Sequence, residues 1–271
     1  MIPDSQVEAW LREDLGHHDV TNEVPGETAG RLVATESGVA AGLDAATAIF
    51  EYLDCTVDPQ VEAGERIDAG QIVLGVRGPA TAVLRGERVA VNVAGHASGI
   101  ATKTRDAVDA AHAVDPEVRV AGTRKTTPGL RGIEKRAVAA GGGDTHRLDL
   151  SHMVMVKDNH VAEMGLEDAI AHFRERVSFA TKLEAEVDDP ADAPRAARAG
   201  ADIVLLDNMV PETTESAVEA LRDAHPAVLA EASGGITVAD VPDYAATGVD
   251  VISMGSLTHS APALDLSFRT G

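Results

Sequence analysis

The sequence predicts an α/β protein in which an N-terminal α+β domain precedes a C-terminal β/α barrel. The first part of the chain mixes short alternating strands with helical segments, whereas after Pro116 short β-branched runs alternate with helical stretches. Two later units also begin alike, at residues 199–204 and 247–252, each with a helix end, a glycine and a buried strand. Such repetition is typical of a barrel, which could be incomplete or open. An open doubly wound sheet is the alternative, but no glycine pattern of the dinucleotide-binding type accompanies it.

The first domain is expected over residues 1–114, joined by the C-terminal tail 262–271. Alternating segments predict strands, and apolar periodicity predicts a helix between them. A long Ala-rich segment with no proline predicts a second helix that leads out of the domain. The expected elements are strands over 31–35 and 71–76 and helices over 43–53 and 85–113.

The barrel is expected over residues 115–261. Its candidate strands are residues 118–121, 153–156, 183–187, 203–206, 228–231 and 249–254. Polar residues or glycines begin about where each apolar run ends, namely Thr123-Arg124-Lys125-Thr126, Lys157-Asp158-Asn159-His160, Glu186, Asp207-Asn208, Ser233-Gly234-Gly235 and Gly255-Ser256. Because the carboxyl ends of barrel strands share the face that carries the active site, we expect these groups to surround one ligand.

The composition is strongly acidic. The chain has 44 acidic and 23 basic residues and a net charge of −21, which argues against a nucleic-acid partner. Excess carboxylate suits a halophilic protein kept soluble in concentrated salt, and an ordinary acidic enzyme is the alternative. A single cysteine, Cys55, excludes an internal disulfide and predicts a reducing compartment. No signal pattern or membrane-length apolar run is found, so we expect a cytoplasmic protein without a membrane partner.

Positive charge gathers in one segment of this acidic chain. Residues 119–157 hold eight basic and three acidic residues. Arginine pairs carboxylate or phosphate groups through a planar fork, and lysine acts as a movable charge. The cluster therefore predicts a small substrate with several negative groups. Surface salt bridges, each contributing about 0 to 1 kcal/mol, are the alternative and would not require such crowding.

Carboxylates and glycines complete the candidate site. Glu186 and Asp207, at the ends of neighbouring strands, predict a Mg²⁺ site, and Glu184 lies on the same side of its strand as a possible second contributor. Residues 233–235 lead into a candidate helix start at residues 236–240 and, with Gly255, predict a phosphate cradle. Together these groups indicate transfer or hydrolysis of a phosphorylated sugar. His17-His18-Asp19 could bind a metal, but is expected to be a polar turn because no second ligand group accompanies it.

At these residues the sequence resembles the quinolinate phosphoribosyltransferase family, also called nicotinate-nucleotide pyrophosphorylase (carboxylating). The motifs that carry the resemblance are Glu13-Asp14-Leu15-Gly16, Asp19-Val20-Thr21, Gly86-Glu87-Arg88, Ser98-Gly99-Ile100-Ala101-Thr102, Thr123-Arg124-Lys125-Thr126-Thr127-Pro128-Gly129-Leu130-Arg131, His146-Arg147, Lys157-Asp158-Asn159-His160, Leu205-Leu206-Asp207-Asn208, Ser233-Gly234-Gly235-Ile236 and Gly255-Ser256-Leu257-Thr258-His259-Ser260. Two positions depart from the family pattern, because Thr145 replaces the usual Asn and His152 the usual Asp. Both lie beside the charged positions, so they concern fine positioning of the substrate.

The resemblance implies a type II phosphoribosyltransferase of NAD biosynthesis. Such a glycosyltransferase converts quinolinate and phosphoribosyl pyrophosphate to nicotinate mononucleotide, carbon dioxide and pyrophosphate, with Mg²⁺. The implied substrate-binding residues are Arg124, Lys125, His146, Arg147 and Lys157 for the two carboxylates of quinolinate, Ser233, Gly234, Gly235 and Gly255 for the 5′-phosphate, and His259 near the pocket. Glu186 and Asp207 would serve metal and ribose, and Lys125, Lys157, Glu186 and Asp207 are the expected catalytic residues.

The resemblance also implies a homodimer, with Arg88 entering the pocket of the second subunit, and higher oligomers remain open. Three other functions remain as alternatives. Two are enzymatic: a molybdenum-locus paralogue of the family and a nicotinate-using relative with the same barrel. The third is a non-catalytic barrel that senses a phosphorylated metabolite.

Overall fold

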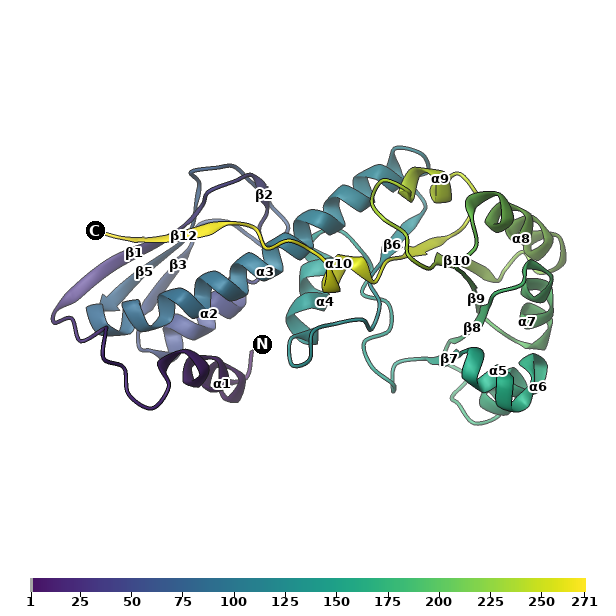
Figure 1. Ribbon diagram of the computed structural model, residues 1–271, viewed down its shortest axis with the longest axis horizontal. Coiled ribbons are helices and arrows are strands. Elements are labelled where there is room, and N and C mark those ends of the chain that lie inside the picture. Colours follow the sequence, from purple (N-terminus) through teal and green to yellow (C-terminus); the bar gives the residue numbers. More distant parts are fainter. Residues whose placement is uncertain (1) are drawn as a thin grey trace. The chain divides into compact units, whose positions relative to one another are not determined.

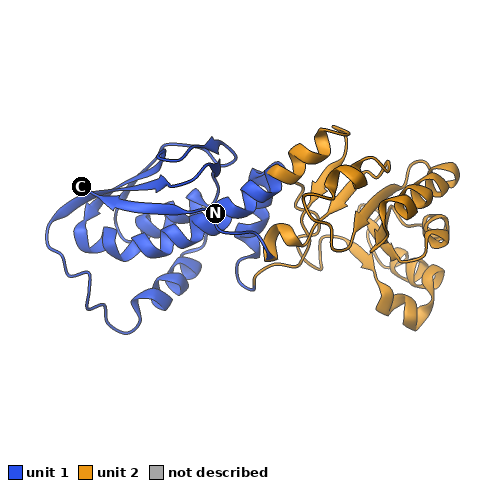
Figure 2. Ribbon diagram, turned by 45° about the horizontal axis from the view of Figure 1, so that its top comes forward, with its two compact units in different colours: residues 1–105, 128–142, 260–271 blue, residues 106–127, 143–259 orange. Residues whose placement is uncertain are grey.

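The protein, described over residues 2–271 by a computed structural model, forms two compact units (Figure 2). The first unit comprises the chain up to Arg105 together with residues 128–142 and 260–271. The second comprises residues 106–127 and 143–259. These units are groups of residues that pack together and not continuous stretches of chain. The expected domain bounds, residues 1–114 and 115–261, therefore stay a prediction.

An antiparallel sheet of four strands forms the frame of the first unit, in the order β12-β1-β5-β3. The elements of this unit are α1 (Asp4–Leu15), β1 (Glu27–Ala34), β2 (Gly38–Val39), α2 (Leu43–Tyr52), β3 (Thr56–Pro59), β4 (Arg66–Ile67), β5 (Ile72–Pro79), most of α3 (Ala80–His112), α4 (Arg131–Ala140) and β12 (Leu266–Thr270). The last strand, β12, pairs with β1 from Gly30 to Ala34 and runs beside it in Figure 1. This mixture of sheet and helices confirms the predicted α+β class.

Helix α2 packs its apolar stripe into the core of the first unit. Ala46, Ile49 and Phe50 are fully buried, at the spacing that places side chains on one helix face. Phe50 stacks on Phe268 of β12, with ring centroids 5.6 Å apart. Glycine at position 86 of α3 allows this packing, because a Cβ there would lie 2.8 Å from the Phe50 ring. The long helix predicted from residue 85 begins earlier, at Ala80.

Asp19 ties the loop after α1 to α3. One carboxylate oxygen accepts hydrogen bonds from the backbone N–H groups of Thr21 and Asn22, and the other accepts from Arg85 Nε at 2.8 Å. The Arg85 guanidinium, followed by these backbone donors, holds the pKa of Asp19 well below its usual range. The segment His17-His18-Asp19 therefore forms the polar turn that the sequence predicts.

Asp19→Asn is expected to lower the stability of the protein at neutral pH, because it removes the charge that pairs with Arg85. A carboxyl with a depressed pKa contributes stability above the pKa of the unfolded chain, about 4, and that contribution fades as the pH falls towards the folded pKa. The difference between the two melting temperatures should therefore be constant from pH 7 to about pH 5 and begin to shrink below about pH 4. The exposed Asp223→Asn is the control, and a pH-independent deficit in Asp19→Asn would contradict the ion-pair explanation.

Six parallel strands form the sheet of the second unit, in the order β6-β11-β10-β9-β8-β7. Its elements are β6 (Arg119–Ala121), β7 (Val154–Val156), α5 (Asp158–Met164), α6 (Leu166–Arg174), β8 (Leu183–Val187), the 3-10 helix η1 (Pro190–Asp192), α7 (Ala193–Ala199), β9 (Ile203–Asp207), α8 (Pro211–Ala224), β10 (Leu229–Ser233), α9 (Val241–Ala245), β11 (Val251–Ser253) and α10 (Ser256–His259). Within residues 2–271, β6 and β7 are the two edges of this sheet. The predicted incomplete β/α barrel is confirmed.

The barrel strands are apolar runs in the sequence because both faces of the sheet are covered by other parts of the protein. Val204, Leu205 and Leu206 of β9 are at most 3% exposed, and helices α6, α7 and α8 line up along the outer side of the sheet (Figure 1). All six strands follow the sequence prediction to within two residues at each end. No helix within residues 2–271 is both long and apolar enough to cross a membrane.

Candidate active site

In the barrel, residues that lie opposite one another on neighbouring strands form levels along the sheet. Glu186 of β8 lies opposite Leu205 of β9, which lies opposite Glu231 of β10. Two residues further along, Asp207 lies opposite Ser233. Side chains of opposed residues point to the same face of a sheet, and alternate residues along one strand share that face. All five residues therefore face the interior of the barrel.

The residues of these levels line a cavity of about 530 Å³ within the second unit. Its lining brings together every predicted site residue except Arg88, namely Arg124, Lys125, His146, Arg147, Lys157, Glu186, Asp207, Ser233, Gly234, Gly235, Gly255 and His259. Met155, Leu205 and Ile236 supply apolar surface to the same cavity. Arg88 is exposed on α3 in the first unit. The cavity can hold a small molecule with several charged groups, and the roles of the individual residues stay predictions.

A loop carries His146 and Arg147 to the cavity at the open edge of the sheet. The backbone of Asp144 pairs with β6, its N–H donating to Val120 O at 2.8 Å and its C=O accepting from Gly122 N at 2.9 Å. The Asp144 carboxylate then accepts from the N–H of His146 at 2.6 Å. His146 itself has a φ of 50°, which is uncommon for a residue other than glycine. This tight turn directs the side chains of His146 and Arg147 toward the barrel interior.

Two arginines, Arg124 and Arg147, line the cavity, and neither forms an ion pair within 4 Å in the described part of the chain. Arg147 is only 7% exposed, and its burial, together with the nearby charge of Arg124, lowers its pKa. The Nε atom of Arg124 is buried and has no hydrogen-bond partner within residues 2–271. Buried cations need a counter-charge, so this part of the cavity is suited to an anionic ligand.

The loops on either side of these arginines are fixed by hydrogen bonds. Thr258 donates its hydroxyl to the backbone oxygen of Lys125 at 2.7 Å, and the Lys125 N–H donates to Thr123 Oγ1 at 3.0 Å. Lys157 Nζ forms an ion pair with Glu186 Oε2. The strand ends therefore present lysine and carboxylate groups in defined positions.

Glu186 and Asp207 are the candidate ligands for a metal ion. Both line the cavity, but neither belongs to a group of three metal-binding side chains within residues 2–271. Mg²⁺ is commonly held by one or two carboxylates, with water and substrate phosphate oxygens completing its shell. The two carboxylates therefore fit Mg²⁺ when a phosphorylated ligand shares it.

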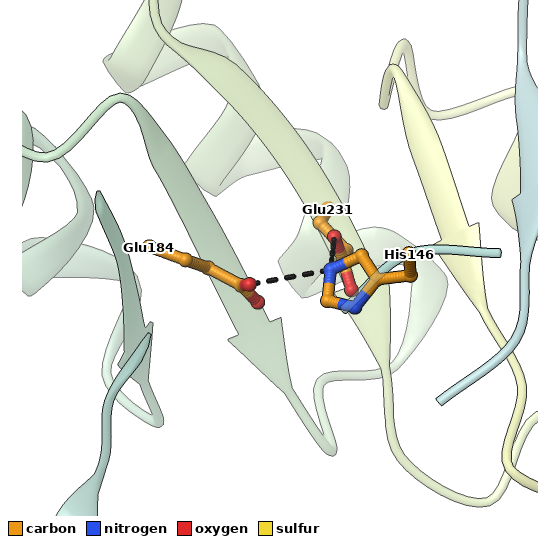
Figure 3. Close-up of side chains that lie close together, drawn as sticks. All are labelled: His146, Glu184 and Glu231. Atoms are coloured by element: carbon orange, nitrogen blue, oxygen red, sulfur yellow. Dashed lines mark ion pairs between the residues drawn. The ribbon is translucent and has the colours of Figure 1, made fainter. Parts of the chain in front are cut away.

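A buried cluster of one histidine and two glutamates lies against the cavity (Figure 3). His146 Nε2 is 3.2 Å from a carboxylate oxygen of Glu184 and 3.3 Å from one of Glu231. Burial lowers the pKa of His146, but the two carboxylates outweigh that effect and raise it to about 10. Burial raises the pKa of Glu184, an effect that the His146 imidazolium opposes. His146 is therefore held as a cation.

The two glutamates differ from what the sequence indicates. Glu184 is not exposed at all, lies 3.2 Å from His146 Nε2 and does not line the cavity with Glu186, and its part as a second contributor stays a prediction. Glu231, which is 1% exposed, was not singled out by the sequence argument. The sequence feature that could have identified Glu231 is its place at the centre of the mostly apolar strand β10. A glutamate in such a position requires a partner.

The turn after β10 requires glycine at position 234. Gly234 has a φ of 106°, and a Cβ there would lie 2.4 Å from Asn208 Oδ1 and 2.6 Å from the Asn208 backbone nitrogen. Gly235 follows with a φ of 66° and open space around it. The helix start predicted at residues 236–240 is wrong, because these residues form a loop and turn and α9 begins only at Val241. Backbone N–H groups, rather than a helix end, are what this turn offers an anion.

Gly234→Ala is expected to destabilise the protein by about 1 to 3 kcal/mol, because alanine there is strained and clashes with the Asn208 backbone. Gly235→Ala is the matched control, since residue 235 also has a positive φ but an added Cβ there meets no other atom. Urea unfolding of both variants measures the difference. Equal losses would show that the contact with Asn208 is not what demands glycine.

Comparisons with known proteins agree over nearly the whole chain. The model of the quinolinate phosphoribosyl transferase N-terminal domain matches residues 19–98, and that of the C-terminal domain matches residues 100–269. A probable nicotinate-nucleotide pyrophosphorylase (carboxylating) of Methanothermobacter thermautotrophicus is 45% identical, with 97% of each chain covered. The human nicotinate-nucleotide pyrophosphorylase (carboxylating) is 44% identical, covering 97% of this chain and 90% of the human one. A crystal structure of NadC from Streptococcus pyogenes, 39% identical, superposes with a TM-score of 0.89 over 98% of this chain and 95% of the other.

Proposed function

The chain belongs to the quinolinate phosphoribosyl transferase family, and we propose that it makes nicotinate mononucleotide from quinolinate and phosphoribosyl pyrophosphate, releasing carbon dioxide and pyrophosphate. One observation carries the proposal. A single cavity in the barrel brings together unpaired arginines, carboxylates at strand ends and a glycine turn. These groups complement the dicarboxylate, the metal-binding pyrophosphate and the terminal phosphate of the two substrates.

Each substrate has its own part of the cavity in this proposal. Arg124, Arg147 and His146, with Lys125 and Lys157, hold the two carboxylates of quinolinate. The turn at residues 233–235, with Gly255, holds the 5′-phosphate of the sugar, and His259 lies at the rim. Because the two sets line one cavity, the pyridine nitrogen and the ribose carbon are brought together in a fixed orientation, which lowers the entropic part of the barrier.

The transfer needs charge stabilisation more than a protein nucleophile. The pyridine nitrogen forms a bond to the ribose carbon while the bond to pyrophosphate breaks, and pyrophosphate leaves with the electron pair. Glu186 and Asp207 face the developing positive charge on the ribose, and the basic side chains of the cavity offset the charge of the leaving group. The adjacent carboxylate then departs as carbon dioxide. Its bonding electrons remain on the ring carbon beside the positive nitrogen, where a proton replaces it.

Glu186 and Asp207 would also hold Mg²⁺, which supplies positive charge to the pyrophosphate oxygens when bound. The ion pair between Lys157 and Glu186 keeps this carboxylate at the cavity wall, and Lys157 would have to give up that oxygen for Glu186 to hold the metal with both oxygens.

The active unit is proposed to be a homodimer in which Arg88 completes the partner's cavity. Arg88 is exposed, although it lies in the motif Gly86-Glu87-Arg88 that resembles the family. An exposed arginine for which no ion pair is found within residues 2–271 is available to a substrate carboxylate of the second subunit.

Incubation of the purified protein with quinolinate, phosphoribosyl pyrophosphate and Mg²⁺ tests the function. The expected products are carbon dioxide, pyrophosphate and nicotinate mononucleotide in equal amounts, at low and at concentrated salt. Turnover of nicotinate without carbon dioxide would instead identify a nicotinate-using enzyme. Binding of substrates without release of pyrophosphate would identify a sensor.

A further inference from the structure

The two buried carboxylates beside His146 have no role in the scheme above. Glu184 comes from β8 and Glu231 from β10, and Figure 3 shows both turned toward the same ring nitrogen. Their exposed fractions are 0% and 1%, and none of their four carboxylate oxygens makes a hydrogen bond within residues 2–271. Burying carboxylates in this way costs free energy unless a cation lies beside them. His146 is the side chain that supplies this charge.

The ring of His146 has two ends with different surroundings. Nε2 is buried between the carboxylates, whereas the residue also lines the cavity and 11% of its side chain is exposed there. Because Nε2 is turned inward, Nδ1 is the nitrogen left for a ligand in the cavity. Its N–H is a donor suited to a carboxylate.

We propose that Glu184 and Glu231 are positioning residues for substrate binding, which hold the His146 ring with Nε2 inward so that Nδ1–H is presented to the acidic pyridine. This inference rests on the proposed function. The carboxylates act through the histidine. Glu184 does not line the cavity, and Glu231 lines it but is only 1% exposed. Their presence in the middle of two apolar strands is explained by this role, because a rigid strand fixes the ring better than a loop does.

Glu231→Gln and Glu184→Gln test the proposal, since glutamine keeps the shape and removes the charge. The KM for quinolinate is expected to rise about tenfold, while the KM for phosphoribosyl pyrophosphate stays within about twofold and kcat within about threefold. The exposed Glu219→Gln is the control. Equal rises in both KM values would point to a general distortion of the cavity and would overturn the proposal.

A second measurement separates positioning from a purely structural role. In a His146→Gln background, adding Glu231→Gln should leave the quinolinate KM unchanged, because the histidine through which it acts is gone. Effects that simply add would refute the proposal. Stoichiometric transition metal in the wild type that is lost in Glu231→Gln would also refute it, since the cluster would then be a metal centre.

The failure of the function and of the inference can be told apart. If the wild type releases no pyrophosphate, the function is wrong, and calorimetry with quinolinate alone still tests the positioning. In that case the wild type should bind quinolinate about tenfold more tightly than Glu231→Gln. Equal affinity would overturn the inference.

Discussion

Arg147→Ala is expected to lower kcat/KM for quinolinate by about 100- to 1000-fold, the loss typical of removing a charged group aimed at the reacting centre. The reason is the site of this arginine. It is almost fully buried, it lies near another guanidinium, and it forms no ion pair within 4 Å inside residues 2–271, although the charges of Glu184 and Glu186 act on it. Its charge is therefore directed at a ligand. Steady-state rates with both substrates varied measure the effect.

Two controls accompany this variant. Arg147→Lys keeps the charge but loses the planar fork, so it should recover part of the activity. Arg176→Ala removes an exposed arginine of the same unit and should leave the rate unchanged. A cooperative thermal unfolding transition of Arg147→Ala should show that the loss of rate is not caused by loss of the fold. Undiminished turnover would refute the assignment of Arg147.

Arg88→Ala is expected to reduce turnover as severely as Arg147→Ala does. This is expected although Arg88 does not line the cavity in the second unit of its own chain. Mixing Arg88→Ala with Arg147→Ala subunits should then restore activity. In a symmetric dimer, random exchange makes half of the dimers mixed, and each mixed dimer has one intact site of two, so about a quarter of the wild-type rate is expected. Subunits exchanged by co-expression provide the measurement.

Mixing Lys157→Ala with Arg147→Ala is the matched control for this experiment. Both side chains line one cavity within one chain, so no mixed dimer contains an intact site and no activity should return. Rescue in this control as well would show that subunit mixing restores activity by another route. Absence of rescue with Arg88→Ala would contradict a cavity shared between subunits.

The barrel could be predicted from the sequence because its signals are local. Strands such as Ile203–Asp207 are apolar runs bounded by glycine or polar residues, and the polar residue at the strand end marks the cavity without knowledge of the fold. The need for glycine at position 234 follows the same rule, since a turn that reverses sharply after a strand requires a positive φ.

The buried cluster and the turn at His146 could not be predicted in this way. Glu184 and Glu231 come together only because β8 and β10 flank β9, which is a matter of strand order. The left-handed turn of His146 depends on Asp144 pairing with β6. Gly141 ends α4 where a Cβ would lie 2.6 Å from the backbone oxygen of Ala101 on α3, so its role is close helix packing, which a glycine-rich run cannot reveal. Each of these depends on contacts between distant segments.

The pairing of β12 with β1 gives the protein an unusual order of assembly during translation. Every residue of the barrel unit is synthesised after β5 and before β12. Until the ribosome has released Thr270, β1 is an uncovered sheet edge and Phe50 lacks the aromatic ring that stacks on it. A nascent chain that pauses after the barrel unit and before β12 therefore exposes a strand able to pair with those of neighbouring chains on a polysome, which favours aggregation at that stage of synthesis.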